Sequence, residues 1–330
     1  MLPALEQEMR AALHADGDTP DLFYGMMHYH MGWVDANLQP ASINGGKRIR
    51  PLLCLLTCQA AGGQWQQALP AAAAIEILHN FSLVHDDIED ASPTRRGRAT
   101  VWQLWGIEQA INSGDTMFAI SHLALNRLAD RGVDPAIVVT ALRRFDETCV
   151  QLTYGQHLDM DFERRDRVTV DEYVTMITGK TAVLIALSAE LGARIAGAPP
   201  DVVEHYAQFG LHLGLAFQVI DDILGIWGDE DRTGKSAATD ILTKKKTLPV
   251  LDGLAKSAEL CQLYAAAPAD EAFVQAVIRI LDDVGTHAFA VERARSHSAS
   301  ALEHLQAAAP AGQAGHALQQ LADMLLTRDF

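Results

Sequence analysis

Four carboxylates close an apolar stretch of this 330-residue chain. The segment "AAAAIEILHNFS" is followed directly by "LVHDDIED", which contains Asp86, Asp87, Glu89 and Asp90. In a helix, Asp86 and Asp90 lie on one face, roughly 6 Å apart along the axis, with Asp87 beside them. Such clustered carboxylates repel one another unless a cation neutralises them, and oxygen ligands with room for water suit Mg²⁺. Taken alone, the stretch also fits a solvated acidic helix end.

A second apolar stretch, "GLHLGLAFQVIDDILG", ends in another carboxylate pair, Asp221 and Asp222. We therefore expect two acidic helix ends that point at one cavity. Basic residues in glycine-rich or short-loop settings occur in "GGKRIRP" (45–51), "RRGR" (95–98), "GKT" (179–181), "TGK" (233–235) and "KKKT" (244–247). Lys and Arg in such places can hold phosphate oxygens. "GGKRIRP" lacks the spacing of a P-loop, and each basic cluster alone also fits a solvated surface.

The elements that position these residues are predicted to be helices. Helical periodicity runs along the whole chain, broken by short Gly, Pro and Asp stretches at intervals of roughly 15 to 30 residues. Strand signals are essentially absent, and 49% hydrophobic residues can bury a substantial core. Because no linker or composition shift divides the chain, we predict one all-α domain spanning residues 1–330.

Together these motifs closely resemble the trans-isoprenyl diphosphate synthase family, all-helical prenyltransferases that include farnesyl and geranylgeranyl diphosphate synthases. The resemblance runs from about Gly45 to Pro249 and includes "LVHDDIEDASPTRRG", "GQHLDMD" and "KKKTLP". It implies a helical bundle of the isoprenoid synthase type, with long helices around a central active-site cavity. It also implies condensation of isopentenyl diphosphate with dimethylallyl, geranyl or farnesyl diphosphate, by ionisation, condensation and elimination. Mg²⁺, with three ions when substrate is bound, and a homodimer are further implications.

The resemblance assigns roles to single residues. The implied metal ligands are Asp86, Asp90, Asp159 and Asp221. The implied catalytic residues are Asp86, Asp87, Asp90, Lys180, Asp221 and Asp222. The implied contacts to the allylic diphosphate are Arg95, Lys180, Thr181, Gln218, Lys235 and Lys245, and those to isopentenyl diphosphate are Lys47, Arg50, His79 and Arg96. Gln218 and His79 lie on otherwise apolar helices, so a satisfied structural polar group is the alternative for each.

The second acidic motif departs from the family's pattern DDxxD, because Gly225 replaces its last aspartate. Asp229 lies seven residues beyond Asp222, about 10 Å along a continued helix, and cannot simply substitute for it. We expect an active enzyme with a weaker second metal site, in which Gly225→Asp raises Mg²⁺ affinity. Trp102 stands where many relatives have His, and the sequence attaches no consequence to it.

Product length is expected to depend on the residues that precede the first motif on its helix. Ser82 lies about one turn and Leu78 about two turns before Asp86, with Phe81 beside Ser82. The ring of Phe81 would act as the floor of an apolar pocket. The resemblance implies geranylgeranyl diphosphate as the product, with farnesyl diphosphate as the next alternative. Packing of Phe81 at a helix interface is the structural alternative.

Composition excludes several other classes. The formal net charge of −16 argues against a nucleic-acid surface. The N-terminal stretch lacks the features of a signal peptide and no apolar run is long enough for a membrane span, so we predict a cytoplasmic protein. The four cysteines, Cys54, Cys58, Cys149 and Cys261, show no CxxC spacing and are expected to be buried reduced thiols. Metal binding by Cys54 and Cys58 is a minor alternative.

Two rival functions stay open at this stage. A terpene cyclase of related fold also ionises an allylic diphosphate, but it binds one diphosphate and needs no second anion site such as Lys47 and Arg50 would form. A catalytically silent partner subunit is the second rival. The intact "DDIED" argues against it, whereas Gly225 keeps it open.

Overall fold

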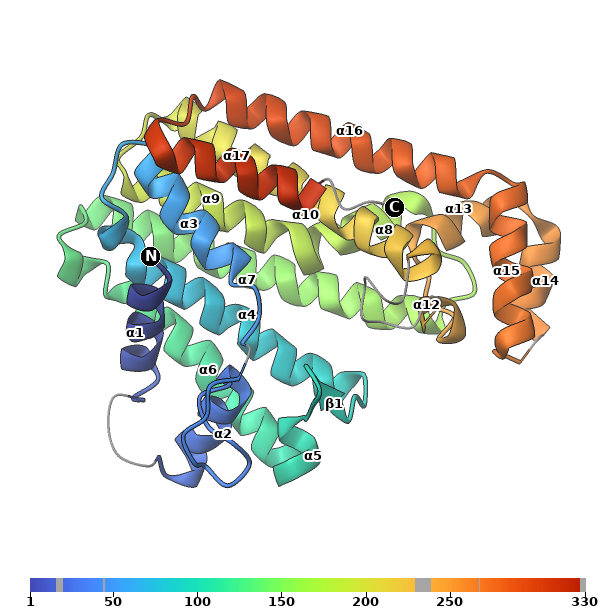
Figure 1. Ribbon diagram of the computed structural model, residues 1–330, viewed down its shortest axis with the longest axis horizontal. Helices are drawn as coiled ribbons and strands as arrows, with labels where there is room; N and C mark the ends of the chain where they lie inside the picture. The colour runs from blue at the N-terminus through green and yellow to red at the C-terminus, as the bar shows by residue number, and fades with distance from the viewer. Residues whose placement is uncertain (16–19, 44, 229–238, 267, 327–330) are drawn as a thin grey trace. The chain divides into compact units, whose positions relative to one another are not determined.

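The computed structural model describes residues 1–15, 20–43, 45–228, 239–266 and 268–326, and these residues are almost entirely helical (Figure 1). The all-α prediction is confirmed. The chain forms two compact units. Unit 1 comprises residues 1–144, 188–200 and 311–315, and unit 2 comprises residues 145–187, 201–310 and 316–330. The single-domain interpretation stays a prediction.

Unit 1 is built around a long apolar helix, α4 (Leu69–Glu89). Its alanines at positions 71–74 are fully buried, and their small side chains let neighbouring helices approach closely. Helices α1, α3 and α6 pack against it. The remaining elements of unit 1 are α1 (Leu2–Ala12), α2 (Leu22–Met31), α3 (Ile49–Ala60), β1 (Thr94–Arg95), β2 (Arg98–Ala99), α5 (Val101–Trp105), α6 (Ile107–Asn126), and 3-10 turns at Trp65–Ala68 and Ala129–Arg131.

A short hairpin follows α4 and was not expected from the sequence. Strands β1 and β2 pair antiparallel, with Arg95 opposite Arg98. The two residues between them, Arg96 and Gly97, have φ values of 52° and 73°. A two-residue loop with positive φ at both positions is a type I′ turn, whose twist matches the paired strands. The hairpin therefore holds the arginines of "RRGR" in fixed positions.

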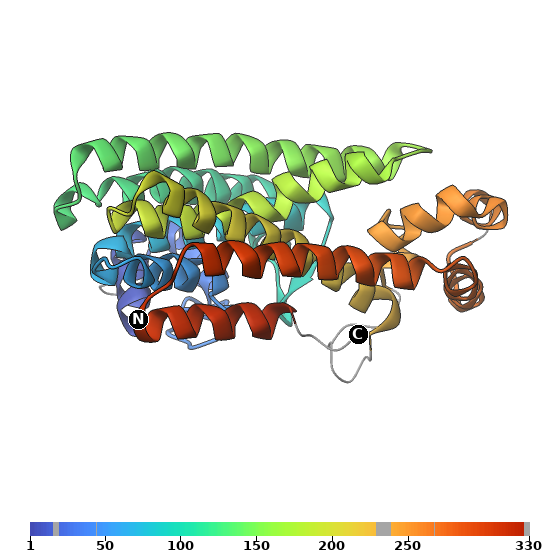
Figure 2. The ribbon, with the colours of Figure 1, turned by 90° about the horizontal axis from the view of Figure 1, so that it is seen from above.

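Unit 2 contains the larger part of α7 (Pro135–Arg164), which begins in unit 1, and the start of α9 (Val183–Ile195), which ends in unit 1. Helices α14 and α15 lie side by side next to α13 (Figures 1 and 2). The other elements are α8 (Val170–Ile177), a π-helical segment (Thr178–Ala182), α10 (Pro200–Trp227), α12 (Thr239–Leu242), α13 (Leu248–Lys256), α14 (Ala258–Ala266), α15 (Glu271–Asp283), α16 (Thr286–Ala307) and α17 (Gly312–Leu326), which begins in unit 1.

The core of unit 2 explains why two of its segments are strongly apolar. Val170–Ile195 and Pro200–Trp227 are long and apolar enough to cross a membrane, yet 67% and 61% of their most apolar windows are buried within the protein. Tyr173 and Ile177 from the first segment pack with Val219, Ile220 and Ile223 from the second. Burial of this kind is what core helices of a folded protein require.

The cysteines follow the prediction with one exception. All four are free, and three of them, Cys54, Cys58 and Cys149, are buried. Burial raises the pKa of Cys58 and of Cys149 to about 12 in each case, so these thiols stay protonated. Cys261 is exposed on α14, and the prediction of a buried thiol is wrong there. The apolar neighbours of Cys261 in sequence bury the opposite face of that helix, as Leu260 does.

Candidate active site

The first acidic motif closes helix α4. Asp86 lies in its last turn, and Asp90 is its C-cap residue, whose N–H donates to the carbonyl of Asp86 at 2.9 Å. Asp86 is partly buried and Asp90 is exposed. One helical turn therefore separates two carboxylates that water or a ligand can reach, as the spacing predicts.

Asp87 has a different environment from its neighbours. It is 2% exposed, and its Oδ1 accepts from Nε of Arg95 at 2.7 Å. Burial raises the pKa of Asp87, against the opposing effect of Arg95. Its Oδ2 is buried without a hydrogen-bond partner among the residues that the structure describes. Asp87 thus holds the arginine that was predicted to contact the allylic diphosphate, and it retains an unsatisfied acceptor.

Guanidinium groups gather around one buried carboxylate in unit 1. Glu76, which is 2% exposed on α4, accepts from Nη1 of Arg48 at 3.1 Å. Burial raises the pKa of Glu76, whereas Arg48, Arg50 and Arg96 act in the opposite direction. Glu6 is a second partner of Arg48 at 3.5 Å, and Asp87 acts on Arg96 as well as binding Arg95. Four guanidinium groups near three carboxylates leave an excess of positive charge that a bound anion can neutralise.

His79 lies one turn from Glu76 and contacts this cluster. Its Nε2 is 3.4 Å from Nη1 of Arg50. Burial, followed by Arg50 and Arg96, lowers the pKa of His79 well below 6.5, so its ring stays neutral and can accept from Arg50. The structure thus brings together three of the four residues predicted to bind isopentenyl diphosphate. The fourth, Lys47, is exposed on the loop that precedes α3.

The hairpin is fastened to its surroundings by residues that sequence reasoning missed. Arg98 donates to the carbonyls of Tyr29 and Val34 at 3.1 and 3.0 Å, and its guanidinium lies 3.7 Å from the centre of the Tyr29 ring. Trp102 donates from Nε1 to the carbonyl of Ser92 at 2.9 Å, which fixes the loop after the first motif. The available signal for Arg98 was its place in "RRGR"; Trp102 was noted without a role.

The residues expected to set product length lie at and near the packing of α4 against α6. Leu78 is fully buried, and Phe81 is 8% exposed. The Phe81 ring lies 5.1 Å from that of Phe118 and 5.0 Å from that of His85, between ring centres. Ser82 donates to the carbonyl of His79 at 2.9 Å. Phe81 therefore does pack at a helix interface, as the structural alternative stated. Its role as the floor of a pocket stays a prediction, because a pocket could have this interface as its wall.

Two glycines in unit 2 bring the "GQHLDMD" and "GKT" motifs together. A Cβ at Gly155 on α7 would overlap the backbone of Gly179 and Lys180, and a Cβ at Gly179 would lie 2.7 Å from the carbonyl oxygen of Gln151. The backbones can meet only because both residues lack side chains. Gly179 and Lys180 belong to the π-helical segment, a local irregularity that often marks functional positions.

This close approach places a lysine on a carboxylate. Lys180 Nζ donates to Asp159 Oδ2 at 2.5 Å. Burial alone would raise the pKa of Asp159, but Lys245 and Lys180 outweigh it and lower that pKa. Asp159 therefore stays ionised beside two cations. Lys245 itself is exposed, and its N–H donates to the carbonyl of Asp240 at 2.8 Å.

The two aspartates of the second motif differ in environment. Asp222 is 4% exposed; its Oδ2 accepts from the Tyr173 hydroxyl and from the Leu248 N–H at 3.0 Å, and its Oδ1 accepts from Gln218 at 3.1 Å. Gln218 also accepts from the hydroxyl of Thr181 at 2.9 Å. Burial raises the pKa of Asp222 to about 6. Because both oxygens of Asp222 accept hydrogen bonds, this carboxylate holds Tyr173, Gln218 and the start of α13 together. Asp221, in contrast to the buried Asp222, is only partly buried.

The space beside Gly225 is already occupied. A Cβ built there would lie 2.6 Å from Oδ2 of Asp240, which comes from α12. Gly225→Asp alone would therefore press one carboxylate against another, and the expected gain in Mg²⁺ affinity does not follow simply from adding an acid. Lys235 and Asp229 lie outside the described residues.

The carboxylates present fit magnesium by their chemistry. Among the residues that the structure describes, no group of three His, Cys, Asp or Glu side chains is arranged to hold a metal ion by itself. Mg²⁺ commonly takes only one or two carboxylates and fills its other positions with water and substrate phosphates. Asp86 with Asp90, and Asp221 on α10, offer that kind of partial ligand set, and the unsatisfied Oδ2 of Asp87 lies beside the first.

Comparison with known proteins gives a consistent result. The sequence model of the polyprenyl synthetase family matches residues 32–281. The (2E,6E)-farnesyl diphosphate synthase of Mycobacterium tuberculosis (strain H37Rv) is 39% identical over 311 residues, which is 92% of this chain and 85% of that protein. The geranylgeranyl pyrophosphate synthase of Geoglobus acetivorans is 39% identical over 86% of this chain and 88% of its own length. A crystal structure of a polyprenyl synthetase from Streptomyces coelicolor A3(2) matches with a TM-score of 0.88 at 34% identity, over 98% of this chain and 96% of that chain.

Proposed function

This chain belongs to the polyprenyl synthetase family as a short-chain trans-isoprenyl diphosphate synthase, and on that premise we propose that it makes geranylgeranyl diphosphate. The enzyme is a prenyltransferase. Its proposed substrates are isopentenyl diphosphate and an allylic diphosphate, either dimethylallyl, geranyl or farnesyl diphosphate. Farnesyl diphosphate is the alternative product, because relatives of both names share 39% identity with the chain.

The observation that carries the proposal is the guanidinium cluster of unit 1. Arg48, Arg50 and Arg96 all act on the buried Glu76; Glu6 also pairs with Arg48 at 3.5 Å, and Asp87 acts on Arg96 while it binds Arg95, so four guanidinium groups face three carboxylates. This supports a metal-free site for the diphosphate of isopentenyl diphosphate, as a coupling enzyme requires. A terpene cyclase binds only one diphosphate, so the cluster disfavours that alternative.

Lys180, Lys245 and Arg95 are proposed to hold the allylic diphosphate. Lys180 binds Asp159, Lys245 acts on the same carboxylate, and Arg95 is oriented by Asp87. Preorganised cations of this kind stabilise the negative charge that grows on a leaving group. Lys235, which lies outside the described residues, is proposed to act with them.

Ionisation breaks the C–O bond of the allylic substrate and leaves an allylic cation and diphosphate. The double bond of isopentenyl diphosphate attacks that cation, a C–C bond forms, and loss of a proton restores neutrality at carbon. We propose that the released diphosphate accepts this proton. Because the double bond itself is the nucleophile, a serine or cysteine nucleophile is unnecessary. The apolar walls contributed by Leu78 and Phe81 would exclude water from the cation.

Magnesium, proposed as three ions with substrate bound, would neutralise the allylic diphosphate as its charge increases. Asp86, Asp90 and Asp221 are the proposed direct ligands, and Asp159 is proposed to belong to the same ligand set. Asp222 is proposed to act by orienting Gln218 and the N-terminus of α13.

We also propose a homodimer and a cytoplasmic location. Four apolar side chains are strongly exposed on α5 and α6, namely Leu104, Ile107, Ile111 and Leu123, each between 39% and 64%. Exposed apolar groups in such numbers on neighbouring elements favour an interface between copies. Light scattering should give twice the 35.8 kDa chain mass for the wild type and the monomer mass for Ile111→Lys.

One assay tests the proposal directly. Purified protein is incubated with Mg²⁺, isopentenyl diphosphate and each allylic primer in turn, and product length is read by chromatography. Geranylgeranyl diphosphate should accumulate. Cyclised hydrocarbon without isopentenyl incorporation would support the cyclase alternative, and no product with any primer would support a silent subunit.

A further inference from the structure

We propose that Lys246 is a positioning residue that sets where Lys245 lies relative to Asp159. This inference rests on the proposed function, because it concerns the residues assigned there to the allylic diphosphate. Lys246 is the last of three consecutive lysines in "KKKT", and the family resemblance assigns a role only to the middle one. The side chains of the other two, Lys244 and Lys246, donate to backbone carbonyls of the protein.

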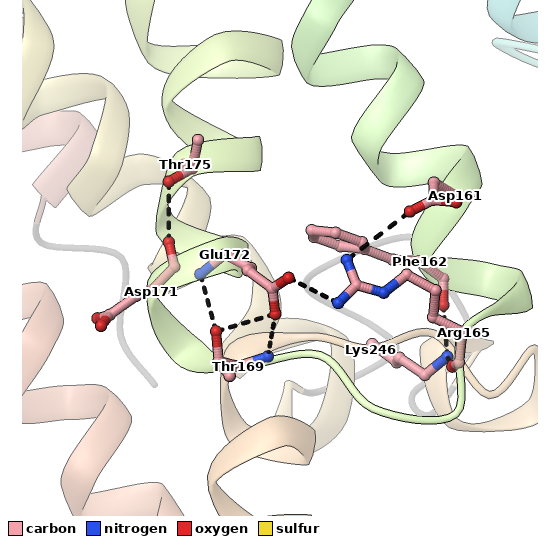
Figure 3. Close-up of polar contacts among 8 residues, drawn as sticks. All are labelled: Asp161, Phe162, Arg165, Thr169, Asp171, Glu172, Thr175 and Lys246. Carbon is pink, nitrogen blue, oxygen red and sulfur yellow. Dashed lines mark hydrogen bonds and ion pairs between the residues drawn. The ribbon is translucent and has the colours of Figure 1, made fainter.

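Lys246 caps the end of helix α7. Its Nζ donates to the backbone carbonyls of Phe162, in the last turn, and of Arg165, just beyond it (Figure 3). The final carbonyls of a helix have no partner within the helix, and a cation there also interacts favourably with the helix dipole. Asp159 lies on the same helix less than one turn before Phe162. The side chain of Lys246 therefore joins its own loop to the helix end that carries Asp159.

The end of α7 that Lys246 binds also makes side-chain ion pairs through Arg165. Arg165 Nη2 binds Glu172 at 2.6 Å, and Nη1 lies 3.7 Å from Asp161 (Figure 3). Glu172 completes a capping box with Thr169 at the start of α8. Since this end is anchored to α8, it provides a fixed point for Lys246 rather than a loose helix terminus.

The loop is fixed at two further points. Two residues after Lys246, the N–H of Leu248 donates to Asp222. On the other side, Lys244 Nζ donates to the carbonyl of Tyr264 at 2.8 Å and lies 5.2 Å from the centre of the Phe273 ring. The lysine between these anchors, Lys245, is exposed.

Lys245 is next to Lys246 in the chain, and Lys180 binds Asp159 on α7. The contact of Lys246 with the end of α7 therefore joins the backbone beside Lys245 to the helix that carries Asp159 and, through Asp159, to Lys180. Without this contact, the loop would lose the anchor nearest to Lys245, and the positions of Lys245 and Lys180 would no longer be fixed relative to each other.

Lys246→Met tests the proposal, because methionine keeps much of the side-chain volume but cannot cap the carbonyls. We expect kcat/KM for the allylic diphosphate to fall about ten- to a hundred-fold, the effect of losing a charge-assisted hydrogen bond. The KM for isopentenyl diphosphate should stay within about twofold, since its proposed site is in unit 1. Lys246→Arg, which can donate to both carbonyls, should restore most of the loss.

The matched control is Lys256→Met. Lys256 binds Asp252 at 2.7 Å within α13 of the same unit, away from Asp159, and its removal should leave both kinetic constants unchanged. If Lys246→Met lowers only the melting temperature, or lowers use of both substrates equally, the positioning role is wrong. If Lys246→Met does not fold, Lys246→Gln is the second variant. Its shorter, uncharged amide can still donate N–H bonds, so it should give an intermediate loss. Wild-type kinetics from Lys246→Gln would overturn the proposal. A wild-type enzyme inactive with every primer would refute the proposed function instead.

Discussion

Truncating Phe81 should lengthen the product of this enzyme. The ring lies five residues before Asp86, about 7.5 Å along the axis of α4, and is 8% exposed where it packs on Phe118 and His85. Replacing a buried Phe by Ala costs about 3–5 kcal/mol when the cavity stays empty. A growing chain that enters the cavity buries one more five-carbon unit, which contributes about 4 kcal/mol at 0.8 kcal/mol per carbon. The gain from an extra unit therefore matches the cost of the empty space.

This balance makes a joint prediction about stability and product. Without ligand, Phe81→Ala should unfold more readily than the wild type by about 3–5 kcal/mol, measured in urea. A longer isoprenyl diphosphate should raise the melting temperature of the variant more than that of the wild type, because it binds only the folded state. Chromatography of the reaction products should show a chain at least one unit longer.

The control removes an equally buried ring elsewhere. Phe273 on α15 is 3% exposed, and Phe273→Ala should show a similar loss of stability with unchanged product length. If Phe81→Ala is destabilised to the expected extent but yields the wild-type product, Phe81 only packs α4 against α6, and the pocket floor must be sought among other residues.

Three further predictions follow from the site and its supports. Gly225→Asp alone should not increase Mg²⁺ affinity, measured by calorimetric titration with a bound substrate analogue, because its Cβ would lie 2.6 Å from Asp240. The double variant Gly225→Asp with Asp240→Ala should increase that affinity. A gain in the single variant would contradict this account. Gly155→Ala should lower the free energy of unfolding by at least about 1–3 kcal/mol and remove most of the activity, since the methyl group would displace the π-helical segment. A melting temperature and kcat close to those of the wild type would show instead that the segment can shift to accommodate the methyl group. His212 and His297 lie 3.0 Å apart between their Nδ1 atoms, and burial lowers the pKa of both below 6.5. Because the unfolded chain then takes up protons at higher pH than the folded protein, the free energy of unfolding should fall as the pH drops through 6.5. His212→Gln should lose less stability than the wild type between about pH 7 and 5, and identical urea unfolding profiles for the two proteins would refute this prediction.

Much of the helical architecture could be predicted because its signals are local. The long apolar periodicity around Ile75 and the Asp spacing in "DDIED" depend only on neighbours along one helix, and the structure confirms the helix that they form. The ion pair of Lys180 with Asp159 was not predicted, although both residues belong to motifs that the sequence singled out. The hairpin at Arg96 was missed because its strands are only two residues long, too short for an alternating pattern.

The contacts between distant residues could not be predicted. Glu76 is the one carboxylate in the apolar stretch before the first acidic motif, but the sequence does not say that three arginines would lie near it. Nor does it separate the two members of the second acidic pair: Asp222 is enclosed by Tyr173 and by the start of α13, residues far from it in sequence. Gly225 faces Asp240 for the same reason. Which side chains meet is decided by packing, after the helices have formed.

Helix α4 carries three components of the proposed reaction on one rigid rod. Glu76 and His79 belong to the anion cluster, Phe81 to the expected pocket floor, and Asp86 to the metal motif. Each added residue in a helix advances it by 1.5 Å but also rotates everything beyond by about 100°. A single insertion between Phe81 and Asp86 would thus turn the carboxylates away from the floor instead of deepening the pocket. Along this helix, the distance between the pocket floor and the metal motif is therefore fixed, and small changes in pocket depth must come from side chains of different size.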